Sequence, residues 1–207
     1  LSYNIEYGTS GFSQGNGTFL NDTSNSYSFT GLLTSQEYEV YIQALCDSSD
    51  SSLWAGPISF STLCIETAPY LENFDNSFPN CFSQTSNDIF NWTLNSGTTA
   101  STTTGPTDDI TGGGDYIYIE ASAPRVPDDS AVVYSPFIDK SFLANSKLTF
   151  YSHMYGTSIG TLKIDVSDDG GSSYSNIYSK SGDQGDQWNF ETVSLAGFSD
   201  TLRFKIS

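Results

Sequence analysis

Residues 38–46 read Tyr-Glu-Val-Tyr-Ile-Gln-Ala-Leu-Cys, a run in which apolar and polar side chains alternate. Tyr38 and Val40 fall on one side of an extended chain, whereas Glu39 and Gln43 fall on the other. Alternation with a period of two is typical of a strand that buries one face against a core. The stretch therefore predicts a half-buried β-strand.

The same alternation recurs along the rest of the chain, and clusters of turn-forming residues separate the runs. The other alternating segments are residues 3–7, 148–154, 162–166 and 202–206, and the turn clusters are 10–11, 15–17, 111–114 and 168–173. No comparable stretch has the spacing of an amphipathic helix. Many short strands separated by turns predict an all-β fold, a sandwich or jelly roll.

The composition excludes several classes of partner. The 207 residues include 24 Asp and Glu but only 7 Lys and Arg, which gives a formal net charge of −17. Because binding to phosphates needs basic side chains, neither nucleic acid nor an anionic membrane surface is expected as a partner. No apolar window approaches the ~20 residues of a membrane-spanning helix, so membrane insertion is not expected either.

A domain boundary is expected near residues 64–69, Cys-Ile-Glu-Thr-Ala-Pro, where short tyrosine-rich segments give way to a new aromatic run. We therefore predict two β-domains, residues 1–64 and residues 65–207. At ~100–150 residues for a typical domain, the chain is long enough for two modest ones.

Residues 1–64 resemble the later strands of a fibronectin type III domain. The resemblance rests on residues 3–8, 31–33, 38–44 and 54–60. It implies that Tyr38 is a tyrosine-corner residue whose hydroxyl bonds to upstream backbone. The first two strands of such a domain have no counterpart, so an unpaired edge and a half-covered core are expected.

Residues 69–207 resemble a MAM domain, the family named for meprin, the A5 antigen and receptor phosphatase mu. The resemblance rests on Phe74-Asp75 with residues 90–92, on residues 104–111 and 116–122, and on residues 153–156 with 159–162. It implies a two-sheet jelly roll. The family pattern ends with an acidic strand beyond position 207, so the closing strand is expected to be missing here.

The order of the two domains resembles arrays in large secreted or surface-anchored bacterial proteins. It implies an extracellular location, with other domains of the same parent chain as partners. Animal MAM domains occur in adhesion receptors and carry more cysteines than the three found here.

Catalysis within the chain is not expected. His153 is the only histidine, and it lies in a predicted strand, where a packed structural role is favoured. Nucleophilic sites need a base beside the nucleophile, and zinc sites need more histidine or cysteine ligands. Paired acids such as Asp128-Asp129 lie in turns, where they cap backbone groups.

Calcium is the cofactor that the sequence favours, in a structural role. Residues 108–115, Asp-Asp-Ile-Thr-Gly-Gly-Gly-Asp, combine carboxylates with a glycine-rich backbone, as calcium loops do. The resemblance adds Asp75, expected on the first strand of the jelly roll, and Asp109, which matches an acidic position of the family. The predicted metal ligands are therefore Asp75, Asp109 and Asp108; the alternative is that Asp109 only caps its turn.

Residues 167–174, Ser-Asp-Asp-Gly-Gly-Ser-Ser-Tyr, have the spacing of an Asp-box hairpin turn. In such a turn Asp169 accepts N–H groups and Gly171 supplies a positive φ. We assign this turn a structural role and no ligand.

A set of tyrosines and one tryptophan is the candidate platform for binding a sugar. Its members are Tyr151, Tyr155, Tyr174, Tyr178 and Trp188. The alternative is that they are ordinary strand aromatics, since isolated exposed aromatics are common.

The three cysteines allow three different single bridges, among which spacing does not choose. Resemblance favours a bridge between Cys46 and Cys64, which leaves Cys81 free; pairing of Cys64 with Cys81 is the alternative.

The leading functional hypothesis is a non-catalytic adhesion or accessory module pair, a fibronectin-like spacer followed by a MAM-like recognition module. The alternative is a carbohydrate-binding module that serves a polysaccharide-degrading or proteolytic enzyme outside this chain. The expected partner is a surface protein or an extracellular polysaccharide.

Overall fold

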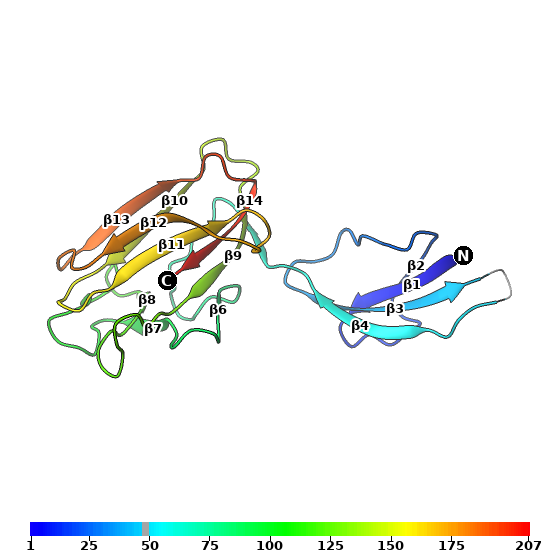
Figure 1. Ribbon diagram of the computed structural model, residues 1–207, viewed down its shortest axis with the longest axis horizontal. Coiled ribbons are helices and arrows are strands. Elements are labelled where there is room, and N and C mark those ends of the chain that lie inside the picture. The colour runs from blue at the N-terminus through cyan, green and yellow to red at the C-terminus, as the bar shows by residue number, and fades with distance from the viewer. Residues whose placement is uncertain (47–49) are drawn as a thin grey trace. The chain divides into compact units, whose positions relative to one another are not determined.

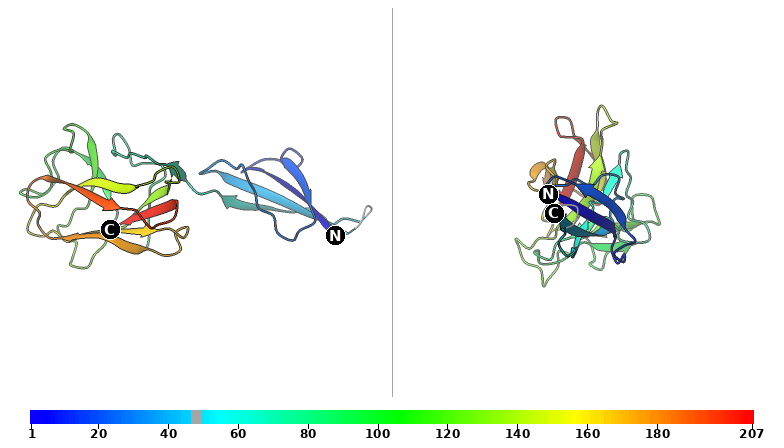
Figure 2. Two further views of the ribbon diagram at one scale, coloured as in Figure 1. Left: turned by 90° about the horizontal axis from the view of Figure 1, so that it is seen from above. Right: turned by 90° about the vertical axis from the view of Figure 1, so that its right-hand side faces the viewer.

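The computed structural model describes residues 1–46 and 50–207 (Figure 1). These residues form fourteen strands and no helix, which confirms the predicted all-β class. Within this part of the chain, no helix with the length and apolar character to cross a bilayer is present. The chain divides into two compact units, Leu1–Cys64 and Ile65–Ser207, each made of sheets and loops (Figure 2).

The N-terminal unit is one antiparallel sheet with the order β2–β1–β3–β4. The strands are β1 (Ser2–Thr9), β2 (Thr18–Asp22), β3 (Glu37–Leu45) and β4 (Ala55–Ser61). The alternation noted at residues 38–46 places Tyr38 and Val40 in the interior, and Ile5 of β1 joins them. The predicted strand at this position is therefore confirmed.

Aromatic side chains provide much of the packing on this sheet. Phe29 contacts Tyr7 at 4.8 Å and Phe60 at 5.4 Å between ring centroids, and Tyr38 stacks on Phe60 at 5.7 Å. The Leu33 N–H donates a hydrogen bond to the Tyr38 hydroxyl at 3.0 Å. The predicted tie between Tyr38 and upstream backbone is thus confirmed.

The C-terminal unit contains ten strands. They are β5 (Ile65–Thr67), β6 (Ser83–Gln84), β7 (Thr93–Ser96), β8 (Asp115–Tyr118), β9 (Val133–Asp139), β10 (Lys147–His153), β11 (Thr161–Ser167), β12 (Ser175–Ser181), β13 (Trp188–Ser194) and β14 (Thr201–Ile206). The largest sheet has the order β12–β11–β14–β9–β5, with β6 also paired to β9. Two smaller antiparallel sheets are formed by β10 with β13 and by β7 with β8.

The core of this unit lies between the large sheet and the β10–β13 sheet, which form the two layers of a sandwich (Figure 1). Its buried members are Ile164, Val166, Leu195, Leu202 and Phe204. Leu148 and Phe150 of β10 pack against this cluster, and the Phe150 ring meets Tyr178 of β12 at 5.0 Å. The sandwich matches the predicted jelly-roll class.

The predicted Asp-box turn is present between β11 and β12. Asp169 accepts the N–H groups of Ser172 and Ser173, both at 3.0 Å, and Gly171 has a φ of 90°. The Ser173 hydroxyl also donates a hydrogen bond to the Asp169 carboxylate, at 2.6 Å. This bond first, and the N–H bonds after it, lower the pKa of Asp169 well below its usual range.

Candidate functional site

Asp109 organises the loop that leads into β8. Its Oδ2 accepts the N–H and the hydroxyl of Thr111, at 2.9 and 2.6 Å, and its Oδ1 accepts the N–H groups of Gly112 and Gly114, at 2.7 and 2.9 Å. These hydrogen bonds, the Thr111 hydroxyl first among them, lower the pKa of Asp109 to about 2. The carboxylate is therefore ionised at neutral pH.

Asp75 reaches the same loop from a distant part of the sequence. Its Oδ1 accepts the Asp115 N–H at 2.9 Å, while Asp115 Oδ2 accepts the Asn76 N–H at 2.8 Å. The expectation that Asp75 lies on a strand is wrong: it lies in the irregular segment between β5 and β6. Its neighbours Phe74 and Asn76 both have positive φ, near 63° and 71°, which is incompatible with an extended strand.

Gly114 is the point at which the two carboxylates converge. A Cβ atom at this position would lie 2.6 Å from Asp75 Oδ1 and 2.8 Å from Asp109 Oδ2. No side chain fits there, so the space beside the glycine is bounded by anionic oxygens from two separate segments. We call Asp75, Asp109, Gly114 and Asp115 the acidic cradle.

The acidic cradle suits a hard cation by its donor chemistry, since Ca²⁺ takes carboxylate and carbonyl oxygens from bent loops. Asp108 contributes differently from the prediction. Its Oδ1 accepts the Asp109 N–H at 2.9 Å, and its main-chain oxygen accepts the Trp188 indole N–H at 3.0 Å. Asp108 therefore shapes the loop, whereas Asp115, which the sequence reasoning did not select, joins the acids of the cradle.

His153 is a packed side chain with 4% of its surface exposed. Its Nε2 lies 3.2 Å from Asp186 Oδ1, and its ring meets Trp188 at 5.4 Å and Tyr155 at 6.4 Å. Burial lowers the pKa of His153, and the bond to Asp186 opposes that effect only in part. The favoured structural role of this histidine agrees with its surroundings.

Tyr151 is the exposed member of the predicted aromatic platform. It is directly opposite Phe190 in the β10–β13 register, with ring centroids 5.1 Å apart. The two side chains are 48% and 58% exposed. Sequence reasoning did not select Phe190, although its place in the alternation of residues 188–194 is the signal that predicts an outward side chain.

The structure does not assemble the other platform residues beside Tyr151. Trp188 is half-buried and packs on Tyr116 at 5.8 Å. Tyr178 packs on Phe150, which points to the opposite face of β10 from Tyr151.

Two further members of the proposed platform are also half-buried. Tyr174 contacts Tyr134 of β9 at 5.7 Å. Tyr155 contacts His153 beyond the end of β10. A single platform of these aromatics is therefore wrong, because strand pairing sends them to different faces.

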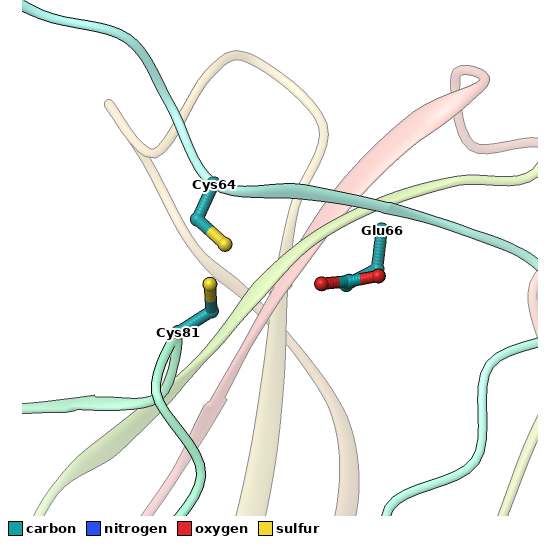
Figure 3. Close-up of side chains that lie close together, drawn as sticks. All are labelled: Cys64, Glu66 and Cys81. Carbon is teal, nitrogen blue, oxygen red and sulfur yellow. The ribbon is translucent and has the colours of Figure 1, made fainter. Parts of the chain in front are cut away.

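The cysteines pair differently from the favoured expectation. Cys46 is an exposed free thiol, and the disulfide joins Cys64 to Cys81. Figure 3 shows these two side chains with Glu66, and one potential ligand atom from each residue lies within 4.8 Å of the others. Because metals bind thiolates and not disulfide sulfurs, the bridged pair is not a metal site.

Comparison with known families identifies the C-terminal unit. The MAM domain family, meprin/A5/mu, matches residues 73–207. The chain belongs to the MAM family. The acidic cradle and the Tyr151–Phe190 pair both lie within this MAM domain.

The chain is similar to parts of several longer proteins. MAM domain-containing glycosylphosphatidylinositol anchor protein 2 from Homo sapiens is 30% identical over 188 residues, covering 82% of this chain and 19% of that protein. The corresponding protein 1 from Gallus gallus is 36% identical over 114 residues, 52% of this chain and 12% of that protein. Neuropilin-1 from Xenopus laevis is 39% identical over 93 residues, 44% of this chain and 10% of that protein.

The chain thus spans about a fifth or less of the length of these curated relatives. The human alignment covers 82% of the chain, more than residues 73–207 alone, so the similarity extends into the N-terminal unit. All three relatives are vertebrate proteins, which gives no support to the bacterial context expected from the sequence.

Proposed function

We propose that this chain is an extracellular recognition module of adhesion type that acts by binding and not by catalysis. The observation that carries the proposal is the MAM domain over residues 73–207, shared with a human protein whose name describes a glycosylphosphatidylinositol anchor. The burial of His153, the single histidine, supports a role without general-base chemistry.

An extracellular location is supported by the Cys64–Cys81 disulfide, because such bonds persist in oxidising compartments. The net charge of −17 keeps the surface acidic and soluble. We assign the N-terminal unit the role of a fibronectin-like spacer. The Tyr38–Leu33 hydrogen bond and the extended similarity to the human relative support this assignment.

We further propose that the MAM domain holds one structural Ca²⁺ ion at the acidic cradle. Asp75 and Asp109 would supply carboxylate oxygens, and the ion would offset the repulsion between the two carboxylates that meet at Gly114. This role links the irregular 68–82 segment to the loop before β8. The metal would hold two surface segments in place and take no part in any reaction.

Calcium binding is tested by thermal unfolding of the full chain in chelator, Ca²⁺ and Mg²⁺. We expect Ca²⁺ to raise the midpoint with a saturable concentration dependence, as a ligand of the native state must. Asp75→Asn removes one carboxylate while keeping an amide of similar shape, so the rise should be lost. Asp22→Asn, in the N-terminal unit, is the matched control and should retain it. An equal response of both variants would contradict the site.

Adhesion is tested with beads coated with the chain and presented to animal cells in calcium. Cells should retain the beads, and excess soluble chain should displace them. The double variant Tyr151→Ser with Phe190→Ser removes the exposed aromatic pair and should reduce retention, whereas Phe142→Ser removes another exposed aromatic and serves as control. Retention that soluble chain does not reduce would contradict specific recognition.

Glycan binding is the second candidate function, and the exposed Tyr151–Phe190 pair is the observation that favours it. Sugar rings can stack on exposed aromatic rings of this kind. A neutral polysaccharide is the expected ligand, because the acidic chain would repel an anionic one. Retention on a panel of neutral and sulfated polysaccharides separates the candidates. Loss of retention in the Tyr151→Ser variant would support the glycan role, and no retention of the folded chain would exclude it.

A further inference from the structure

A depression of about 350 Å³ is lined by residues of the N-terminal unit, which is not the unit that carries the proposed function. Its lining residues are Glu6, Gln14, Gly15, Gly17, Phe19 and Trp54. This volume lies near the lower end of the ~300–1,000 Å³ typical of small-ligand pockets. It suits a single side chain or a compact ion.

Glu6 supplies the depression with an acidic side chain. The residue is only 4% exposed, and its Oε1 accepts the N–H groups of Gly15 and Gly17, both at 2.7 Å. The loop between β1 and β2 is closely fitted over this carboxylate. A Cβ on Gly17 would lie 2.5 Å from Phe12 Cε2 and 2.7 Å from the Tyr7 oxygen, so only glycine allows the approach.

The second oxygen of Glu6 is available to a ligand. Among the described residues, both hydrogen bonds to the carboxylate end on Oε1 and none is found on Oε2. Oε2 is also absent from the fully buried polar atoms that lack a partner, so it keeps some contact with solvent. Since Glu6 lines the depression, this oxygen supplies an acceptor at its surface.

Aromatic rings complete the lining. Phe19 is directly opposite Glu6 in the β1–β2 register and is 59% exposed. Its ring meets Trp54 edge to face, with centroids 6.4 Å apart. Aromatic faces attract cations, and the attraction adds to that of a nearby carboxylate.

The N-terminal unit has no cation of its own for this site, because residues 1–64 contain no Lys, Arg or His. A buried carboxylate beside one exposed ring, Phe19, and one half-buried ring, Trp54, therefore lacks a basic partner within its unit. We infer that this depression binds a basic side chain of a partner protein, with the guanidinium of arginine preferred. Guanidinium is planar, so it can stack on a ring while donating hydrogen bonds to the carboxylate.

The test is a titration of the ¹⁵N-labelled full chain with N-acetyl-arginine amide, followed through the tryptophan indole resonances. The Trp54 resonance is identified from a Trp54→Phe variant, and it should shift saturably in the millimolar range. The resonances of Trp92 and Trp188 should stay in place. N-acetyl-citrulline amide, which has a neutral head of nearly the same shape, should produce no saturable shift of Trp54.

Two variants locate the charge. Glu6→Gln keeps an oxygen for the Gly15 and Gly17 N–H groups but removes the charge, so binding should weaken by about tenfold or more. Glu39→Gln, on β3, is the matched control and should bind as the parent chain does. If Glu6→Gln loses the dispersed spectrum of a folded protein, Trp54→Ala, followed through backbone amides of residues 14–19, provides the second test.

Any of the following outcomes would overturn the inference: no saturable shift, equal binding of the citrulline probe, or full binding by a folded Glu6→Gln variant. A further titration with tetramethylammonium represents a choline headgroup. Binding of that probe without binding of the arginine probe would also overturn it, because the site would then prefer a quaternary ammonium group to a guanidinium. None of these results depends on the calcium site or on bead adhesion. The arginine-binding inference can therefore fail while the proposed function holds, and the proposed function can fail while this inference holds.

Discussion

The N-terminal and C-terminal units both consist of β-sheet, but they bury their side chains to different degrees. The single sheet of residues 1–64 buries Ile5, Tyr38 and Val40 yet leaves Leu33, Leu53 and Ile58 exposed. The sandwich of residues 65–207 leaves Leu202 and Val133 with 1% and 0% of their surface accessible. In the MAM domain a second sheet covers the apolar face of the first and excludes water from it, whereas the sheet of the N-terminal unit is covered by no second sheet of the described residues.

The two units also differ in the groups that pair with their acidic side chains. In the MAM domain, Lys180 pairs with Glu191, and Lys205 pairs with Asp165 at 3.2 Å. In the N-terminal unit, which has no basic side chain, Glu6 relies on backbone N–H groups alone. The half-buried Glu191 and Asp165 are thus each paired with a lysine, whereas the buried Glu6 is balanced by backbone dipoles.

The largest expected effect tests the difference in burial. Leu202→Ala should lower the free energy of unfolding of the MAM domain by about 4 kcal/mol, because a fully buried leucine leaves both lost transfer energy and a cavity. Ile58→Ala, at an exposed position of β4, should cost less than about 1 kcal/mol. Urea unfolding followed by circular dichroism measures both, and equal costs would contradict the comparison.

The next effect concerns the disulfide within the chain segment 64–81. Replacing Cys64 and Cys81 by serine should lower the free energy of unfolding by about 3 kcal/mol, as expected for a loop of this length. Cys46→Ser is the control, since its thiol is exposed and free, and it should change stability by less than about 0.5 kcal/mol. A Cys46→Ser variant destabilised as much as the double variant would indicate that Cys46 takes part in the bridge, and would contradict the Cys64–Cys81 pairing.

A smaller effect is expected for the hydroxyl of Tyr38. Tyr38→Phe keeps the stacked ring but removes the acceptor for the Leu33 N–H, which should cost about 1 kcal/mol. Tyr27→Phe changes an exposed ring of the same unit and should cost nothing measurable. Thermal unfolding of both variants is the measurement, and identical midpoints would argue against the tie.

The smallest effect is a change in acid sensitivity. The folded-state pKa of Asp109 is lowered to about 2 from its ordinary 3.8, so the unfolded chain takes up the proton more readily. The contribution of Asp109 to the free energy of unfolding is fully present above the pKa that this group has in the unfolded chain, and it is lost as pH falls from about 4 through 2. Asp109→Asn should remove this contribution, so its unfolding free energy should fall less steeply over that window than that of the parent chain.

Several features of the fold were predictable because they depend on local pattern. Alternation at residues 38–46, 148–154 and 202–206 predicted strands that the structure contains. A fixed short spacing predicted the Asp-box turn, and the resemblance to a fibronectin type III domain implied the tie of Tyr38 to its own upstream backbone. Resemblance over the motifs of residues 74–162 predicted the MAM domain that the family comparison confirms.

Features that depend on distant segments were less predictable. The pairing of Cys64 with Cys81, and not with Cys46, goes with the pairing of both β5 and β6 to β9, since Cys64 and Cys81 shortly precede these two strands. The proposed aromatic platform failed because pairing of β10 with β13 brings Tyr151 to Phe190, while Tyr174 and Tyr178 pack elsewhere.

The sequence by itself determined that this protein is all-β and acidic, because period-two patterning and composition are properties of the chain, and its motifs carried the resemblance to the MAM family. Only the tertiary structure decided that Asp75 and Asp109 meet at Gly114 and that Glu6 lies beneath a glycine loop beside Phe19. Such convergence depends on strand register and on close backbone approach. Neither is encoded in the spacing of single residues, since both arise from the packing of segments that are far apart in the chain.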